Sequence, residues 1–411
     1  MDRCFSLPEA VEAARVPLKA LQGAPGIRRV ALAGAVRRHV ETVRSVTIVA
    51  GVGNKAAGSG TLPEPGSGQN RRDVRLEGGL PAQIVLVPDE CFGVSLFLRT
   101  GSHAHVASIT AMAGEQGLTL SEQGIFRGAR RMGGAHEEEV YSLLGLPYVP
   151  PELRENGEEI VEASDGDLPR LITRDDLRGD LHVHTNWSDG AGTLEDMAAK
   201  AKSLGYAYLG ITDHAHRLED GWGVHERDLG RQLEAIDQLN EKLQGLRLLK
   251  GAEVEILPDG SLGLSDSILA MLDYTVCSIH TRFDLPAGKQ TARILKAMDH
   301  PRFRILAHPS GRVLCNPGGH QAHMGEIIAG AAERGRILEA NAKRDRLDLD
   351  GFHCDLAREA GALIALCTDA HSPEAMDNMV YGLGQARRGR LGPEHVLNAM
   401  EPEDVLRVLK G

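Results

Sequence analysis

Histidine and carboxylate side chains recur at the ends of short apolar runs in the second half of this 411-residue sequence. The first run delivers His182-x-His184, a pair that shares one face of a strand, and Asp189 follows in the next loop. The later candidates are His214, Glu253, His280, His308, Asp369 and His371. Imidazole and carboxylate ligands without thiolates suit Zn²⁺, Mn²⁺ or Fe better than Mg²⁺. We therefore predict a site for divalent metal ions formed by these side chains, and Glu255 in the same run as Glu253 is a further candidate carboxylate.

The segments that must position these side chains alternate between β-like runs and amphipathic stretches. The runs are 181–184, 208–212, 248–256, 274–279, 304–307, 337–339 and 363–368, and helices are expected at 193–204 and 232–243 among others. This alternation predicts parallel strands joined by helical crossovers. Seven runs suit a closed barrel better than an open sheet. Because parallel barrels carry their active sites at the carboxyl ends of the strands, the candidate ligands are expected at one rim.

The composition is that of an ordinary soluble globular protein, with 42% hydrophobic and 25% charged residues. We find no apolar stretch long enough to span a bilayer and no signal peptide at the N-terminus, so we expect a cytoplasmic protein. The six cysteines form no Cys-x-x-Cys pair, which argues against a thiolate zinc site. The whole of the acidic excess follows residue 150, so bound cations would have to reverse the negative local charge before a phosphate ester could bind.

Two composition shifts divide the chain. Residues 51–69 are rich in Gly, Ser and Pro without apolar periodicity, which predicts a loop rather than a phosphate-binding turn. The segment 151–178 combines prolines with acidic residues just before the alternating pattern begins, so we place a linker there. A barrel domain is expected to follow it, at 179–411.

Four motifs of the second half resemble those of the polymerase and histidinol phosphatase (PHP) domain. They are Asp180-Leu-His-Val-His-Thr185 with Ser188-Asp-Gly190, then Thr212-Asp-His214, His308-Pro309 and Thr368-Asp-Ala-His371. The resemblance implies a distorted (β/α)7 barrel with a trinuclear metal centre, so we expect two or three divalent ions held by nine side chains. It also implies that His182, His184, Glu253 and Asp369 hold one ion, that Glu253 bridges to a second held by His280 and His308, and that Asp189, His214 and His371 hold a third.

The activity that this resemblance implies is hydrolysis of phosphate esters, with Glu253, Asp369 and His371 at the reacting centre. Arg282 and Arg312 follow ligand positions by two and four residues and could contact phosphate through paired N–H groups. Surface salt bridges explain these two arginines equally well.

Several polar residues near the motifs receive no role as ligands. Glu255 is expected to be solvated or to support a ligand side chain. His216, His320 and His323 lie outside the β-like runs and are expected to be exposed.

The first half resembles the palm and thumb of bacterial family X DNA polymerases that carry a C-terminal PHP domain. The matching segments are Ala33-Gly-Ala-Val-Arg-Arg38, Phe92-Gly93, Thr100-Gly-Ser102, Glu137-Glu-Glu-Val-Tyr141 and Leu144-Gly-Leu-Pro147. An α+β, nucleotidyltransferase-like palm is therefore expected at 1–90 and a thumb at 91–150. The sequence starts within the palm, so the N-terminal helical domain of the family is expected to be missing.

This sequence departs from the family at the polymerase site itself. The family's Asp-x-Asp falls on Ser45-Val46-Thr47, its third aspartate falls on Gln83, and the serine expected after Gly34 is Ala35. Hydroxyl and amide groups cannot replace three anionic ligands of hard dications, so nucleotidyl transfer should fail.

Several functions remain open at this point. We favour a metal-dependent 3′-5′ exonuclease and 3′-end phosphatase in DNA repair, with DNA 3′ ends as its partner, because the neighbouring domain resembles a polymerase. The alternatives are a small-molecule phosphatase akin to histidinol phosphatase, a bifunctional family X polymerase, and a non-catalytic DNA-binding scaffold. The sequence identifies no protein partner.

Overall fold

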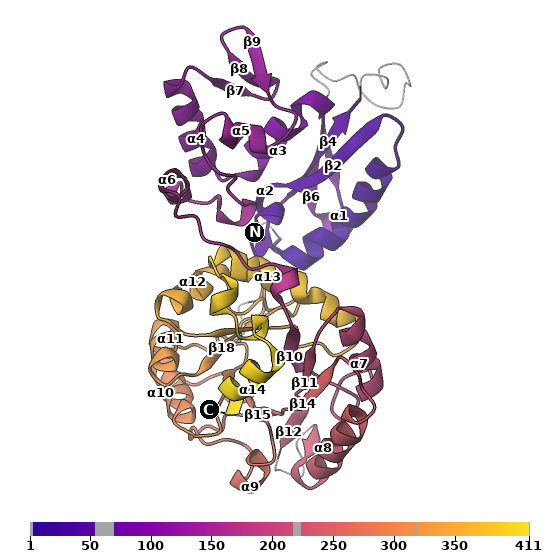
Figure 1. Cartoon of the computed structure of the whole chain (residues 1–411), viewed down its shortest axis with the longest axis vertical. Coiled ribbons are helices and arrows are strands. Elements are labelled where there is room, and N and C mark those ends of the chain that lie inside the picture. The colour runs from indigo at the N-terminus through magenta and orange to yellow at the C-terminus, as the bar shows by residue number, and fades with distance from the viewer. Residues whose placement is uncertain (1–2, 54–69, 217–222, 317–318, 411) are drawn as a thin grey trace. The chain divides into compact units, whose positions relative to one another are not determined.

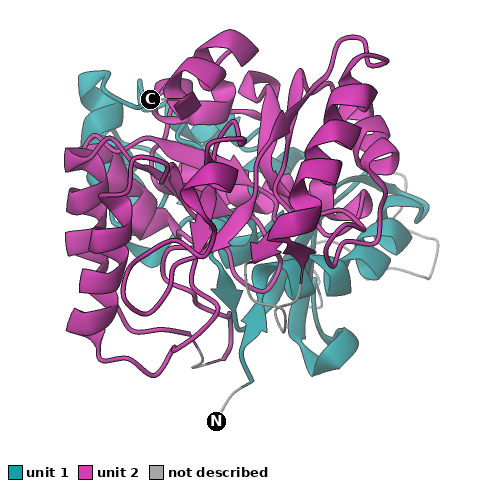
Figure 2. Ribbon diagram, turned by 90° about the horizontal axis from the view of Figure 1, so that it is seen from below, with its two compact units in different colours: residues 1–169 teal, residues 170–411 magenta. Residues whose placement is uncertain are grey.

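The computed structural model describes residues 3–53, 70–216, 223–316 and 319–410, and these separate into two compact units, 1–169 and 170–411 (Figures 1 and 2). Most of the predicted loop at 51–69 lies outside the described residues; its first residues, Gly51 and Val52, close a strand. In the described part of the chain, no helix combines the length and the apolarity needed to cross a bilayer.

Unit 1 is built on a four-stranded mixed sheet with the order β2-β4-β6-β5. Its strands are β2 (Ile27–Ala33), β4 (Val46–Val52), β5 (Arg71–Arg75) and β6 (Pro81–Pro88), and the short pair β1 (Phe5–Ser6) and β3 (Thr42–Val43) lies apart from them. The helices are α1 (Leu7–Gln22), α2 (Gly34–Arg37), α3 (Phe92–Thr100), α4 (His103–Glu115), α5 (Glu138–Ser142) and α6 (Glu158–Asp165). A small antiparallel sheet follows α4, made of β7 (Thr119–Ser121), β8 (Gly124–Arg127) and β9 (Arg130–Gly133).

Unit 2 alternates parallel strands with helices, as the periodicity predicts. Its strands are β10 (Gly179–Val183), β11 (Tyr208–Ile211), β12 (His214–His216), β13 (Val224–His225), β14 (Arg247–Lys250), β15 (Glu253–Glu255), β16 (Val276–Ser278), β17 (Ile305–Leu306), β18 (Ile337–Asn341) and β19 (Ile364–Cys367). They form two parallel sheets, β10-β11-β14 and β13-β12-β15-β16-β17-β18-β19. The α/β class with parallel strands is therefore confirmed.

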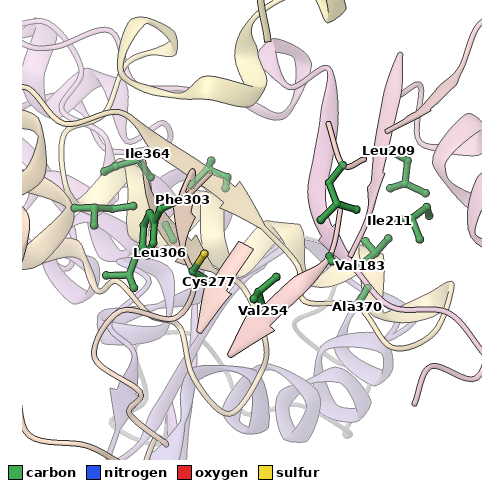
Figure 3. Close-up of a cluster of buried hydrophobic side chains, with 14 of the residues drawn as sticks. Val183, Leu209, Ile211, Val254, Cys277, Phe303, Leu306, Ile364 and Ala370 are labelled. Carbon is green, nitrogen blue, oxygen red and sulfur yellow. The ribbon is translucent and has the colours of Figure 1, made fainter. Parts of the chain in front are cut away.

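The helices of unit 2 lie outside its strands (Figure 1). They are α7 (Leu194–Ser203), α8 (Glu226–Asn240), α9 (Asp266–Leu269), α10 (Ala287–Met298), α11 (Met324–Glu333), α12 (Gly351–Glu359), α13 (Met379–Arg388) and α14 (Pro402–Lys410). In α7 the buried side chains recur at helical spacing, Leu194, Met197, Ala198 and Ala201, so one face packs inward. Thr193 caps this helix through the backbone N–H of Asp196. Strand side chains such as Leu209, Val254 and Leu306 belong to the same hydrophobic core (Figure 3).

The predicted run 248–256 is two strands rather than one. β14 pairs with β11, whereas β15 pairs with β12 and β16. The break falls at Gly251, where an added Cβ would lie 2.7 Å from Cγ2 of Thr212. The neighbouring strand breaks beside it, between β11 and β12, so both strands change sheet just before their candidate ligands.

Candidate metal centre

The candidate ligands of unit 2 gather into overlapping groups; most lie near the carboxyl ends of parallel strands or just beyond them, and His214 and Glu253 are the first residues of β12 and β15. Three groups have ligand atoms within 4.8 Å of one another: His184, Asp189, His214 and His371; His182, His184 and Asp369; and His214, Glu253 and His280. In the described part of the chain, such groups occur only in this unit. The structure thus brings together side chains from segments almost 190 residues apart in sequence, from His182 to His371.

Glu253 divides its two carboxylate oxygens between two sets of histidines. Oε2 lies 3.1 Å from Nε2 of His182 and 3.4 Å from Nε2 of His184. Oε1 lies 3.1 Å from Nε2 of His308 and 3.4 Å from Nε2 of His280. This is the arrangement that a carboxylate bridging two cations requires.

The remaining candidates extend the cluster on the side of His184. Nε2 of His184 lies 3.1 Å from Oδ1 of Asp369, and Nε2 of His371 lies 3.1 Å from Oδ2 of Asp189. His214 connects the two sides, because its Nδ1 lies 3.1 Å from Glu253 and its Nε2 lies 3.9 Å from Asp189. All nine side chains therefore belong to one continuous cluster.

Local backbone features aim these ligands. Gly190 lies so close to the strand end that an added Cβ would be 2.7 Å from the backbone of His184, and this close approach turns the Asp189 loop back over the strand. His308 and Asp369 both have positive φ, +28° and +50°, a strained conformation for residues with side chains. Such strain is concentrated at functional sites, where surrounding contacts maintain it.

The electrostatics of the cluster favour charged carboxylates. Burial would raise the pKa of Glu253, but the imidazoles of His214, His182 and His280 outweigh it and hold this pKa well below its usual range. Burial lowers the pKa of His214 to about 3, so its ring is neutral and can act as a ligand at pH 7. Burial also acts to lower the pKa of His182, but Glu339, Glu253 and Asp369 raise it well above the ordinary value.

The donor set fits divalent metal ions. The ring of His184 is fully buried, yet neither of its nitrogens has a hydrogen-bond partner among the described residues. Buried polar atoms without partners are costly, and coordination to a cation would satisfy a nitrogen that faces Glu253 and Asp369. The free, buried cysteines Cys277, Cys354 and Cys367 belong to none of the three groups, so the set is one of nitrogen and oxygen ligands.

The carboxylates of Glu339 and Glu255 hold ligand side chains in place, and of these two only Glu255 was expected from the sequence to have such a role. Glu339 is fully buried; its Oε1 lies 2.7 Å from Nδ1 of His182, and its Oε2 accepts the backbone N–H of His308 at 2.6 Å. Glu255 accepts the backbone N–H of His280 at 2.8 Å and lies 3.2 Å from its Nδ1. Carboxylates in such positions fix the orientation and tautomer of metal-binding histidines.

Two further buried aspartates brace the strand ends. Asp180 accepts the backbone N–H groups of His182 and Thr368, each at 3.2 Å. Asp213 accepts Thr185 Oγ1 at 2.6 Å and Ser188 Oγ at 2.6 Å. Both aspartates belong to the PHP-like motifs, because Asp213 directly precedes His214 and Asp180 lies two residues before His182. This position is the feature of the sequence that could have indicated a supporting role.

The two arginines proposed to contact phosphate differ in their surroundings. Arg312 donates to the backbone oxygen of Arg346 at 2.9 Å, to that of Leu347, and to Asp350 at 3.0 Å, so its guanidinium anchors the segment 346–350. This favours the salt-bridge interpretation. The side chain of Arg282 is 54% exposed and forms an ion pair with Asp284 at 3.2 Å, so its contact with phosphate stays a prediction.

The expected exposure of the remaining histidines is wrong for His320. Its side chain is only 8% exposed, and burial lowers its pKa to about 4. It packs against Gly311, a contact between two loop residues that local sequence does not reveal. His323 is exposed, as expected, whereas His216 is partly buried and lies within β12 rather than in a loop.

The positions that match the lost polymerase aspartates are neighbours in unit 1. Thr47 of β4 pairs with Gln83 of β6, which pairs in turn with Asp73 of β5. Gln83 donates to Asp73 at 3.1 Å and accepts from Arg99 at 3.3 Å. A cavity of about 480 Å³ opens here, lined by Ser45, Thr47, Asp73, Val74, Arg75, Pro81, Ala82 and Gln83. Thr47 and Gln83 are thus neutral neighbours on this sheet, and Asp73 is the carboxylate that lines the cavity with them.

Comparison with known proteins agrees with this division. A family model described as PHP domain matches residues 180–348, and one described as DNA polymerase beta thumb matches residues 95–155. The protein named DNA polymerase/3'-5' exonuclease PolX of Bacillus subtilis is 34% identical over 392 residues, which cover 92% of this chain and 68% of that protein. A probable phosphatase of Syntrophotalea carbinolica is 25% identical over 229 residues, or 53% of this chain and 90% of the phosphatase. A probable phosphatase of Thermoanaerobacter pseudethanolicus is 29% identical over 203 residues, or 47% and 78%. The chain therefore belongs to the bacterial family X DNA polymerases that carry a PHP domain.

Proposed function

We propose that this protein is a metal-dependent phosphoesterase that removes nucleotides or phosphate from DNA 3′ ends. The observation that carries the proposal is the division of the Glu253 oxygens between His182 and His184 on one side and His280 and His308 on the other. A buried carboxylate between two sets of imidazoles is suited to hold two cations close together, as two-metal hydrolysis of phosphate esters requires.

We propose three ions, with the ligands divided as follows. His182, His184, Glu253 and Asp369 hold one ion, Glu253, His280 and His308 a second, and Asp189, His214 and His371 a third. Zn²⁺ or Mn²⁺ suits this set of nitrogen and oxygen ligands, and Fe is a further candidate. Divalent ions held there supply Lewis-acid activation of water and neutralise the charge that develops on phosphoryl oxygens.

The strands that carry these ligands are proposed to form a closed, distorted (β/α)7 barrel. Three observations support closure. β10 pairs with β11, which with its continuation β12 leads into the larger sheet. At the other end of that sheet, Val183 forms a parallel bridge with Ala370, just beyond β19. The backbone N–H of His184 also donates to the oxygen of Ala370 at 2.8 Å.

Other residues of the chain would orient the ligands and contact the substrate. Glu339 and Glu255 keep His182 and His280 oriented, so the rings do not have to reorganise when substrate binds. Lys343 lies 3.4 Å from Oδ2 of Asp369 and places a positive charge at the edge of the centre. Arg282 is proposed to hold a substrate phosphate through its exposed guanidinium.

A polymerase-derived first half favours DNA as the substrate. We propose that residues 1–90 are a degenerate palm, 91–150 a thumb, 151–178 a linker and 179–411 the PHP domain. The neutral pair Thr47 and Gln83 supports the loss of nucleotidyl transfer, because hard dications prefer anionic oxygen ligands. A small phosphate ester is the second candidate substrate, since two probable phosphatases are each similar to about half of this chain.

Incubation with Mn²⁺ and either 3′-labelled DNA or histidinol phosphate tests the proposal. We expect release of the label and no comparable hydrolysis of the small ester, and we expect the release to be lost in Asp369→Ala. Hydrolysis of histidinol phosphate alone would replace DNA by a small ester as the substrate. A metal-loaded protein that cleaves neither compound would instead be a DNA-binding scaffold.

A further inference from the structure

An exposed aromatic ring borders the metal centre. Phe283 follows His280 by three residues, and its side chain is 43% exposed. Proteins that bind single-stranded nucleic acid use aromatic side chains as surfaces on which bases stack. Neither hydrolysis nor metal binding requires a phenyl ring at this position.

His320 fixes one side of this ring. The two rings are nearly parallel in a stacked arrangement, with centroids 6.2 Å apart and an interplanar angle of 6°. Burial lowers the pKa of His320 to about 4, so the imidazole is a neutral aromatic ring at pH 7. His320 rests in turn on Gly311, where an added Cβ would lie 2.6 Å from Cδ2 of the imidazole.

The two loops that form this stack follow neighbouring strands of the metal centre. Phe283 lies after β16, and Gly311, whose N–H donates to His308 O at 2.8 Å, lies after β17. His280 and His308 from these strand ends both face Oε1 of Glu253, at 3.4 and 3.1 Å. The stacked pair therefore borders the part of the centre that these two histidines form.

We infer that Phe283, backed by His320, is the stacking platform for the 3′-terminal nucleobase of a DNA strand whose terminal phosphodiester is cleaved at the metal centre. The inference rests on the proposed function and adds a specificity-determining residue to it. A planar, apolar surface beside a phosphate-binding centre matches a nucleotide, which joins a planar base to a phosphate. Stacking tolerates any base, because every base has a π face. The platform would thus favour a DNA end over a small ester that lacks a base.

A comparison of two DNA substrates, with and without the terminal base, tests the platform. The rate constant kcat/KM is measured for DNA ending in an ordinary 3′ nucleotide and for DNA ending in an abasic residue. For Phe283→Ala we expect kcat/KM on the ordinary end to fall about 5- to 150-fold, the range for loss of one aromatic–base stack. The abasic end should change less than about 2-fold by the same reasoning, and Phe283→Trp should retain the preference. The control is Phe352→Ala, which removes a 68% exposed phenyl whose ring contact with His353 is edge-on at 74°.

Binding of a strand that resists cleavage separates this inference from the proposed function. A strand with 2-aminopurine at its 3′ end and a phosphorothioate at the terminal linkage should lose fluorescence on binding the wild type, because stacking quenches the base. The quenching should disappear in Phe283→Ala. Quenching without cleavage of ordinary DNA would uphold the platform and refute the nuclease. Equal losses of activity on ordinary and abasic ends, or full quenching in Phe283→Ala, would overturn the platform.

Discussion

Replacement of Glu339 by glutamine should weaken metal binding although Glu339 is not itself proposed as a ligand. The substitution keeps the shape of the side chain and removes its charge. Oε1 of Glu339 lies 2.7 Å from Nδ1 of His182, and Oε2 accepts the N–H of His308 at 2.6 Å. When Nε2 of His182 binds a cation, Nδ1 carries the proton, so both neighbours of Glu339 are donors. The glutamine NH₂ group must then face one of them, and that donor loses its acceptor.

The size of the effect follows from these contacts. Loss of a carboxylate that orients a metal-binding histidine lowers metal affinity about 10- to 100-fold, or about 1.4 to 2.7 kcal/mol. The unpaired buried donor should also lower the stability of the apo protein by about 1 to 3 kcal/mol. Calorimetric titration with Mn²⁺ and chemical denaturation without metal measure the two effects separately. The matched control is Glu326→Gln on the exposed face of α11. Unchanged Mn²⁺ affinity in a destabilised Glu339→Gln protein would refute the reasoning.

Three further predictions concern charged residues and the polymerase site. The arginines that bind Glu137 outweigh the effect of its burial and lower its pKa to about 2. The ionised carboxylate therefore stabilises the folded protein by about 3 kcal/mol above pH 4.5, and this stabilisation is lost as the pH falls through about 2. Denaturation curves should show that Glu137→Gln costs this much stability at pH 7 and almost none at pH 2. Purified protein should not extend a gapped primer in the presence of Mg²⁺ or Mn²⁺, and extension that persists in Asp369→Ala would show that the palm is active. Arg312→Ala should lower the melting temperature more than it alters KM, whereas Arg282→Ala should raise KM for DNA ends without a loss of stability; the opposite pattern would exchange their roles.

The candidate ligands could be predicted from sequence because they follow a rule of position. Most of them stand at or just beyond the end of a β-like run, and parallel strands bring such positions to one rim; Glu253 is an exception, because it lies inside the run 248–256. His182 and His371 are far apart in the chain, yet strand-end placement alone indicated their proximity. The identity of the side chains then indicated metal rather than catalysis by isolated acids and bases.

The supporting residues could not be found in the same way. Glu339 ends the run 337–339, where the rule of position would place a ligand, and nothing local distinguishes a ligand from a carboxylate that supports two histidines. The burial of His320 likewise depends on the turn at Gly311, a contact between two loop residues.

Element boundaries failed where tertiary contacts override the local pattern. The run 248–256 reads as one strand, but the close contact between Gly251 and Thr212 divides it between two sheets. The helix expected at 232–243 is α8, which starts at Glu226 because His225 caps it. Its first turn is polar, so it lacks the apolar periodicity that indicates a helix in the sequence.

Metal content per chain tests the central claim most directly. Elemental analysis of the protein purified without chelators, beside a His182→Ala, His184→Ala double variant and the control Glu326→Gln, measures how many ions these side chains hold. The account predicts two to three divalent ions in the wild type and the control, and a loss of most of them in the double variant. Fewer than one ion per chain in the wild type, or equal metal content in all three proteins, would contradict it.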